Sequence, residues 1–259
     1  MRSLYLAWES PQPRRAWYPI GLLLADPPKH LYQFAYTKGA QIASKEVGLK
    51  PLDAFPDFKK FYESAELFPL FQNRILSPGR EDFREYIDQL ALTPGNADPL
   101  EILAVSGGER QTDSLEVFPK IEKHKDGSFK CRFLLHGGRL LNSAAIERVH
   151  PLKEGDELQV SVELNNPATT LAIQLQTRDY HVVGWTPRYL VRDLIKVLED
   201  PAHITAKVVK VNPSPAPSRM RILVELEGHW PQNYEPMSSP EFQPIIKSLF
   251  SQWRSQKLS

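Results

Sequence analysis

Residues 133–198 constrain the fold more than any other stretch, because strand-like and helix-like patterns follow one another there in a fixed order. An apolar strand ends in HGGR at 136–139, and two further strands are joined through NNP at 165–167. A last strand ends in VGW at 183–185, directly before Thr-Pro and a helical pattern. Several short strands with one long helix are typical of a small barrel or split barrel.

The abundance of proline supports this interpretation. The 259 residues include 23 prolines, more than the usual share of about 5%. Because proline fixes φ and removes a backbone donor, it favours strands, turns and corners over a helical bundle. Hydrophobic residues make up 41% and charged residues 24%, so a packed core is expected. We predict an α+β, mostly β fold in one large or two small domains.

Alternating apolar residues predict strands along the whole chain. The first three, at 4–8, 17–25 and 31–37, form an antiparallel meander, with a proline turn at 26–29. The other predicted strands cover 114–119, 130–135, 157–164, 171–176, 203–211 and 220–226. The predicted helices cover 77–90, 98–105, 142–149 and 186–198.

Charge and cysteine content limit the partners and the compartment. The formal net charge is +1, so bulk attraction to nucleic acid is not expected and any anion site must be local. Cys131 is the sole cysteine, which excludes an intramolecular disulfide and a cysteine-rich zinc site. The apolar run at 20–25 is far shorter than the roughly 20 residues of a membrane span. Residues 1–15 lack the order of a signal peptide, so we expect a soluble, cytoplasmic protein without a membrane partner.

The helix after Pro187 carries the clearest binding signal in the chain. Its apolar residues are expected to face the core: Leu190, Val191, Leu194, Ile195 and Leu198. Its basic residues are four apart on another face: Arg188, Arg192 and Lys196. Free N–H groups at a helix N-terminus, with guanidinium groups beside them, favour phosphate binding. The alternative is a solvated surface helix whose charge is balanced by Asp193 and Glu199.

Trp185 stands just before this helix and has two interpretations. In one, its ring receives a base or a sugar, since aromatic stacking is how single strands are held. In the other, the ring fills the wall of the barrel.

The motifs of this stretch resemble those of the HIRAN domain, a small β-barrel module of some DNA-remodelling helicases and of separate bacterial proteins. The shared order is Gly-x-Arg at 137–139, Asn-Pro at 166–167, Leu-Ala-Ile at 171–173 and Val-Gly-x-x-Pro-Arg-x-Leu at 183–190. The resemblance implies a modified oligonucleotide-binding barrel that holds single-stranded or end-exposed DNA. The residues it assigns to binding are Arg139, Asn166 and Thr169. With the stacking residue Trp185 and the helix cations Arg188, Arg192 and Lys196, they form the predicted DNA-binding set.

Three positions depart from the HIRAN pattern. Leu140 stands where the family often has an aromatic residue, which removes one stacking surface. Thr169 and Leu171 stand where an acidic residue and an amide help to receive a 3′-terminal nucleotide. Threonine can still form a hydrogen bond, whereas leucine cannot.

Residues 1–120 resemble the N-terminal β-rich subdomain of HipA-like proteins. The motifs are Tyr-x-Phe-x-Tyr at 32–36 and the apolar segment at 68–76. HipA proteins continue into a kinase body, which this chain lacks at that point, so kinase activity is not expected. We predict a HipA-like domain at 1–120, a HIRAN-like barrel at 121–230, and a tail at 231–259 with a helix over 242–253.

No enzyme signature is present in the sequence. Nucleophile elbows, His-Glu-x-x-His, phosphate-binding loops and dinucleotide glycine patterns are missing, and the seven histidines do not pair at metal-ligand spacing. We therefore predict no catalytic residue, metal or cofactor, and a DNA-binding module in DNA repair or replication-fork processing. The alternative is a protein-interaction adaptor, favoured by exposed-looking aromatics (Trp8, Trp17 and Tyr18). A third hypothesis is a nuclease whose metal-binding acids are scattered along the chain.

Overall fold

The computed structural model describes residues 2–13, 15–93, 97–110, 112–198 and 204–246. Two antiparallel sheets and several short helices make it mostly β, which confirms the α+β, mostly β prediction at that level. Across the described ranges, no helix combines the length and the apolar character that a membrane span requires.

The chain forms two compact units. The first unit contains residues 1–76, 99–120 and 238–259, and the second contains 77–98 and 121–237. The division into domains at residues 120 and 230 stays a prediction.

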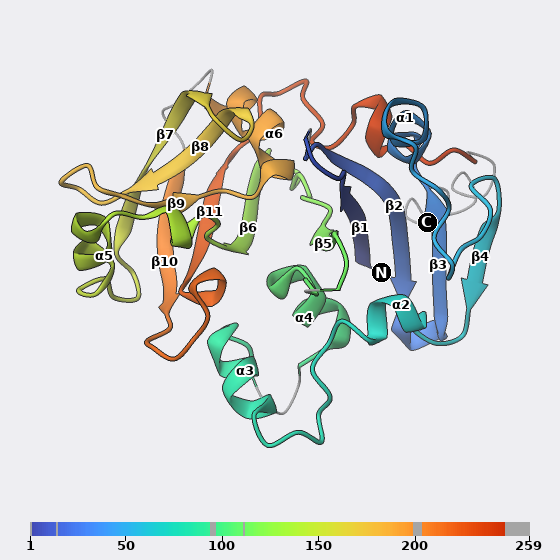
Figure 1. Ribbon diagram of the computed structural model, residues 1–259, viewed down its shortest axis with the longest axis horizontal. Coiled ribbons are helices and arrows are strands. Elements are labelled where there is room, and N and C mark those ends of the chain that lie inside the picture. The colour runs from blue at the N-terminus through green and yellow to red at the C-terminus, as the bar shows by residue number, and fades with distance from the viewer. Residues whose placement is uncertain (1, 14, 94–96, 111, 199–203, 247–259) are drawn as a thin grey trace. The chain divides into compact units, whose positions relative to one another are not determined.

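The sheet of the first unit has five strands in the order β4-β3-β2-β1-β5, all antiparallel to their neighbours (Figure 1). Their bounds are Arg2–Glu9 (β1), Trp17–Asp26 (β2), Leu31–Tyr36 (β3), Phe61–Ser64 (β4) and Leu115–Pro119 (β5). The predicted meander of the first three strands is therefore confirmed. The predicted turn between β2 and β3 is a short 3-10 helix, Pro27–Lys29.

The core of the first unit covers both faces of this sheet. Leu4 and Leu6 point into a cluster in which Phe34 stacks on Phe55, with ring centroids 3.9 Å apart. Tyr5, which lies between those leucines in β1, stacks instead on Phe118. Because alternate residues of a strand point to opposite faces, burial of all three means that β1 is covered on both sides.

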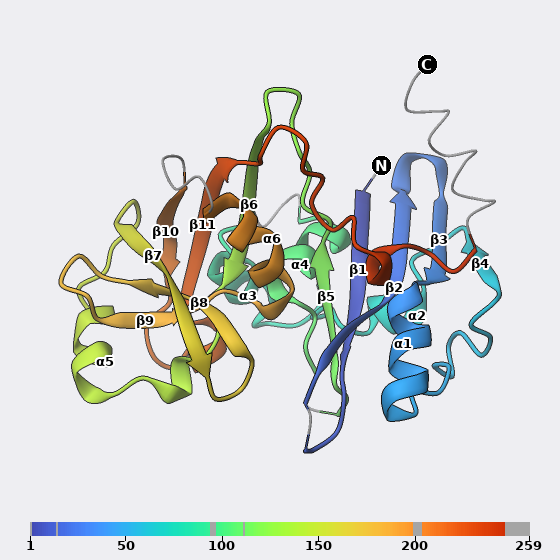
Figure 2. The same cartoon turned by 90° about the horizontal axis from the view of Figure 1, so that it is seen from above.

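Among its described residues, the first unit has α-helices at Lys38–Val47 (α1), Pro69–Gln72 (α2) and Pro99–Ser106 (α4). The predicted helix at 98–105 corresponds to α4. The sequence did not predict α1, which packs on β2 (Figure 2). Its buried residues are Gly39, Ala40 and Ala43, whose small side chains give little hydrophobic signal.

The predicted exposure of the N-terminal aromatic residues is corrected by the structure. Tyr18 is buried, and its hydroxyl donates to Glu46 at 2.9 Å. Trp8 packs against Tyr18, and both Trp8 and Trp17 are half-buried. These rings stabilise the first unit because they lie in or beside its core.

The sheet of the second unit has six strands in the order β6-β11-β10-β7-β8-β9. Their bounds are Ser128–Leu134 (β6), Glu157–Asn166 (β7), Thr170–Gln176 (β8), Val182–Trp185 (β9), Thr205–Val211 (β10) and Ile222–His229 (β11). All pairings are antiparallel.

A closed barrel, as the HIRAN-type prediction required, is not found among the described residues. The sheet has two edges, β6 and β9, which are joined by an isolated bridge between His136 and Trp185. Two backbone hydrogen bonds of 2.9 and 3.1 Å form this bridge. Continuous pairing stops there because Gly137 turns the chain away with a φ of 77°.

The helices of the second unit are Phe83–Gln89 (α3), Ser143–Val149 (α5) and Arg188–Leu198 (α6). α5 begins as predicted, with the Asn142 side chain accepting a hydrogen bond from the Ala145 N–H. α3 begins at Phe83 instead of near Ser77, because the preceding residues form turns around Pro78 and Gly79. The predicted helix at 242–253 lies largely outside the described residues, and Phe242 itself ends a 3-10 helix, Pro240–Phe242.

Candidate nucleic-acid interface

Trp185 lies at the end of β9, where the bridge to His136 holds its backbone. Its ring packs directly on Gly137. A Cβ atom added at Gly137 would come within 2.3 Å of the indole Cε3, so only glycine fits there. The indole N–H donates to Glu163 Oε2 at 2.6 Å, and the side chain is half-buried. The ring is therefore fixed in position, and Trp185 as a whole residue is only half-buried.

Asn166 joins Trp185 on the same carboxylate. Its amide Nδ2 donates to Glu163 Oε2 at 2.9 Å. Its Oδ1 accepts hydrogen bonds from the backbone N–H groups of Ala168 and Thr169 and from the Thr169 hydroxyl. Asn166 thus organises the β7–β8 turn and connects it to the Trp185 side chain.

Glu163 is the site residue that the sequence analysis missed. No motif identifies it, but the strand register does. Glu163 lies opposite Ala172 on β8, and Trp185 lies opposite Gln174, two residues further along β8. Residues two apart share a face of the sheet, so Glu163 and Trp185 are diagonal neighbours across β8. We call Gly137, Glu163, Asn166, Thr169 and Trp185 the Trp185 cluster.

Arg139 lies beside the Trp185 cluster in the chain. It is exposed and belongs to a 3-10 turn, Gly138–Leu140, which follows Gly137 directly. The other side of this turn is equally close-packed, since a Cβ at Gly138 would lie 2.9 Å from the Ser218 carbonyl oxygen. The turn that carries Arg139 is therefore held between the Trp185 ring and the segment at Ser218.

The basic residues of α6 lie on the outer side of that helix. Arg188 is half-buried, and Arg192 and Lys196 are exposed. The opposite side packs on the core through Leu190, Leu194 and Val197, as the spacing predicted for the two leucines. α6 begins three residues after Trp185, so these cations follow the Trp185 cluster along the chain.

Asp193 is not a solvent-exposed charge, as the surface-helix alternative supposed. It is buried, and its Oδ1 accepts hydrogen bonds from the Tyr234 hydroxyl at 2.5 Å and the Met237 N–H at 3.1 Å. It therefore fastens α6 to the segment that follows β11. Glu199, the other acid of that alternative, lies outside the described residues.

The structure thus brings three predicted residues, Asn166, Thr169 and Trp185, into one hydrogen-bonded cluster, and it places the turn of Arg139 next to them. The carboxylate at the centre has a chemical consequence. Glu163 occupies the indole N–H, so only the ring surface of Trp185 remains for a ligand. Its negative charge also disfavours a phosphate close by, so a nucleic-acid backbone would have to follow the basic residues.

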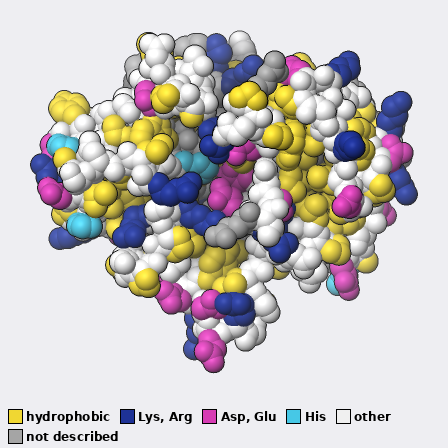
Figure 3. Space-filling view, in the orientation of Figure 1, with side chains coloured by type: hydrophobic (Ala, Val, Ile, Leu, Met, Phe, Trp, Pro, Cys, Tyr) yellow, Lys and Arg dark blue, Asp and Glu magenta, His cyan; other side chains and the backbone are white. Residues whose placement is uncertain are grey.

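The surface charge agrees with a local site. On the part of the face in Figure 3 that belongs to the second unit, Lys and Arg side chains stand in separate small groups among apolar and uncharged surface. With a net charge of +1, binding must depend on individual contacts and not on a broad positive field.

Comparisons with known proteins do not identify a family. No family model matches the chain, and no curated protein matches it. A solved structure from Lactobacillus plantarum, a structural-genomics target, aligns over 40% of this chain and all of its own at 14% identity, with a TM-score of 0.31. A likeness of that size carries no argument about fold or function.

Proposed function

We propose that the second unit is a non-enzymatic DNA-binding module for single-stranded or end-exposed DNA. The resemblance of residues 133–198 to the HIRAN domain suggests this ligand class and a role in DNA repair or replication-fork processing. The bridge between His136 and Trp185 supports the proposal only in that it brings the end of β9 next to the segment that follows β6.

The observation that carries the proposal is the convergence of separate segments on Trp185. The β6 end supplies Gly137, the β7–β8 turn supplies Asn166, and β7 supplies Glu163. A ring fixed from three directions is preorganised, so the protein loses little conformational entropy when a base stacks on it. Stacking of this kind contributes about 1–3 kcal/mol per base.

The phosphates are assigned to the cations on either side of Trp185 in the chain. Arg139 lies two residues after Gly137, on which the Trp185 ring packs. Arg188 is the first residue of α6, three residues after Trp185. Arg192 and Lys196 extend the same side of the helix by further turns. In this mode the ring selects unpaired bases, and the cations bind the backbone without reading its sequence.

Fluorescence anisotropy with a labelled single-stranded oligonucleotide tests the proposal. Arg139→Ala and Arg188→Ala should each weaken binding and lower the salt slope by about 1. Arg178→Ala is the matched control, because its side chain is 83% exposed in the same unit and it follows β8, at the end of that strand opposite the β7–β8 turn. Circular dichroism confirms that each variant is folded. The proposal is contradicted if Arg139→Ala and Arg188→Ala lose no more affinity than Arg178→Ala, or if the wild-type protein does not bind the oligonucleotide.

The end chemistry of the DNA provides a second measurement. The Thr169 hydroxyl donates within its own turn to Asn166, and Leu171 has no polar group. We therefore expect oligonucleotides with 3′-hydroxyl and 3′-phosphate ends to bind equally well. A clear preference for the hydroxyl end would show that another residue receives it.

A protein-interaction adaptor is the second candidate, and one observation favours it. Leu140 and Leu164 are 77% and 71% exposed, and Leu140 is next to Arg139. Apolar side chains in that state favour a protein partner over a phosphate backbone. The adaptor is supported if a partner binds stoichiometrically to the wild-type protein, if Leu140→Ser with Leu164→Ser abolishes that binding, and if DNA affinity is lacking.

A further inference from the structure

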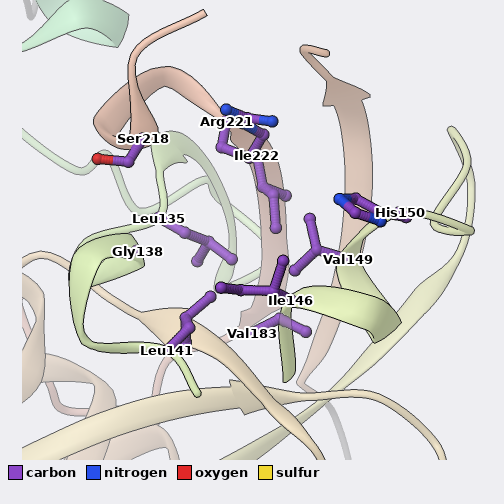
Figure 4. Close-up of a pocket in the computed structure, with 10 residues that line it drawn as sticks. All are labelled: Leu135, Gly138, Leu141, Ile146, Val149, His150, Val183, Ser218, Arg221 and Ile222. Carbon is purple, nitrogen blue, oxygen red and sulfur yellow. The ribbon is translucent and has the colours of Figure 1, made fainter. Parts of the chain in front are cut away.

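A pocket of about 180 Å³ lies within the second unit, next to the turn of Arg139 (Figure 4). It is lined by residues from the segment after β6, from α5 and its end, from β9, and from the start of β11 with the segment before it: Leu135, Gly138, Leu141, Ile146, Val149, His150, Val183, Ser218, Arg221 and Ile222. None of the residues assigned to DNA binding lines it.

The floor of the pocket is apolar. Six aliphatic side chains converge there in Figure 4: Leu135, Leu141, Ile146, Val149, Val183 and Ile222. An apolar cavity of about 150 Å³ is known to hold benzene in another protein, so this volume suits one ring or a short branched chain. Ile146 is 43% exposed, which gives a ligand an entrance without unfolding of the core.

Three polar side chains stand around this floor, those of His150, Ser218 and Arg221. Figure 4 shows the Arg221 guanidinium beyond Ile222 and the His150 imidazole beside Val149, while the Ser218 hydroxyl points away. Arg221 Nη2 donates to the Ala216 carbonyl at 3.0 Å, which fixes the guanidinium and leaves other N–H groups for a ligand. The ten lining residues, all within the described ranges, include no aspartate or glutamate.

We propose that this pocket binds a small apolar carboxylate: one ring or a short branched chain that bears a single carboxylate. The apolar body fills the floor, and the carboxylate pairs with Arg221, whose planar group binds carboxylates through two parallel hydrogen bonds. His150 provides a further donor for the same anion. A neutral ligand of equal size would leave the guanidinium without its partner.

Titration with phenylacetate, followed by NMR of the backbone amides, tests the proposal. Shifts should appear at the lining residues, and phenylacetamide, which has the same shape without the charge, should bind at least tenfold more weakly. Arg221→Gln should remove this difference, while Arg219→Gln, a neighbouring arginine outside the pocket, should preserve it. Equal binding of the two compounds to the wild-type protein, or shifts elsewhere only, would overturn the proposal.

A second variant covers the case in which Arg221→Gln fails to fold. Ile146→Trp fills the pocket from a partly exposed position and should abolish the shifts caused by both compounds. If phenylacetate still shifts the lining residues of this variant, the proposal is wrong.

Free acids and the C-terminus of a peptide share this chemistry, and a further titration separates them. The peptide Gly-Gly-Phe is compared with its C-terminal amide. Tighter binding of the peptide acid than of phenylacetate identifies a chain terminus as the ligand, and weaker binding identifies a free acid. Binding of neither acid overturns the proposal. Arg139→Ala separates it from the DNA proposal, since phenylacetate binding should be unchanged.

Discussion

The two sheets of this protein differ in how completely they bury their own apolar residues. In the first unit, β1 and β2 are covered on both faces. Among the described residues, the exposed large hydrophobic side chains all belong to the second unit: Leu140, Ile146, Val162, Leu164 and Tyr180. Three of these are near proposed sites, since Leu140 follows Arg139, Ile146 lines the pocket, and Leu164 follows Glu163. This difference is the one that our proposals for the second unit predict, since both proposed sites lie there.

The polar groups in the core of the first unit also differ from those of the Trp185 cluster in the second unit. In the first, Arg74 and Tyr36 hydrogen-bond backbone groups of their own core. In the second, the Glu163 carboxylate holds the ring of Trp185, which as a whole residue is half-buried. Substitutions in the first unit should therefore lower stability alone, whereas those in the Trp185 cluster should change binding as well.

The largest expected effect belongs to Arg74→Met in the first unit. The Arg74 side chain is 2% exposed and pairs with Asp113 at 2.5 Å. Its Nη1 donates to the carbonyls of Gly108 and Leu115 at 2.9 and 3.3 Å. Removal of one partner of a buried ion pair costs about 3–5 kcal/mol, because the remaining polar groups lose their hydrogen bonds.

Amide hydrogen exchange measures this effect in each unit separately. The Val117 N–H, which donates to Gly107 at 2.7 Å, should lose protection in Arg74→Met, while amides of β10 and β11 keep theirs. Arg80→Met, at an exposed arginine, is the control and should change neither unit. Equal loss of protection in both units would show that they unfold together.

Gly137→Ala should have the next largest effect and should act on the second unit. The new Cβ meets the Trp185 ring at 2.3 Å, and φ at this position is 77°. Strain and overpacking together should lower the free energy of unfolding by about 2–4 kcal/mol. Trp fluorescence during thermal unfolding measures it, and DNA affinity should fall because the ring moves.

Gly155→Ala is the matched control for this change. Its φ is 87°, but no atom lies within 4 Å of the added Cβ. It should therefore show the backbone strain alone and retain DNA affinity. If both variants lose equal stability, the contact between Gly137 and Trp185 is unimportant.

Periodicity and turn chemistry were sufficient to predict most strands, the start of α6 and the Asn142 cap, because these depend on residues close in sequence. α1 was missed because its buried residues are Gly39, Ala40 and Ala43, which a hydrophobic pattern does not detect. The sequence predicted a barrel for the second unit, but among the described residues its sheet stays open, with an isolated bridge between His136 and Trp185.

The candidate site shows the same limit. Asn166, Thr169 and Trp185 were proposed from motifs, and the structure brings them together. Glu163 has no motif, and it becomes visible only from the pairing of β7, β8 and β9. Asp193 looked like a surface charge because its partner, Tyr234, is 41 residues away in the chain. Contacts that depend on long-range register are not encoded in local patterns.

Tyr36→Phe should have a smaller effect on the first unit. The Tyr36 hydroxyl donates to the Phe55 carbonyl at 2.8 Å and accepts from the Leu52 N–H at 2.7 Å. Both partners lose a hydrogen bond in the variant, which should lower the free energy of unfolding by about 1–3 kcal/mol. Urea denaturation at neutral pH measures this difference.

The stability of the wild-type protein and that of Tyr36→Phe should respond differently to alkaline pH. Burial raises the pKa of Tyr36 to about 12, from about 10 in the unfolded chain. The folded state therefore keeps its proton where the unfolded state loses it, so the contribution of Tyr36 is fully present below pH 10 and declines as pH rises toward 12. The stability advantage of the wild-type protein over Tyr36→Phe should narrow between pH 10 and 11.5. A constant advantage would contradict the assignment.

The smallest effect on stability is expected from the loss of exposed leucines in the second unit, which can be compared with the loss of a buried leucine in the first. Leu140→Ser combined with Leu164→Ser removes two leucines that are mostly exposed, so the free energy of unfolding should change by less than about 0.5 kcal/mol. Leu6→Ala in β1 removes one leucine that is fully buried and should cost about 2–5 kcal/mol. Urea denaturation compares the two variants. A large loss in the double variant would mean that these leucines pack against something in solution, such as a second copy of the chain, and a concentration-dependent midpoint would reveal it.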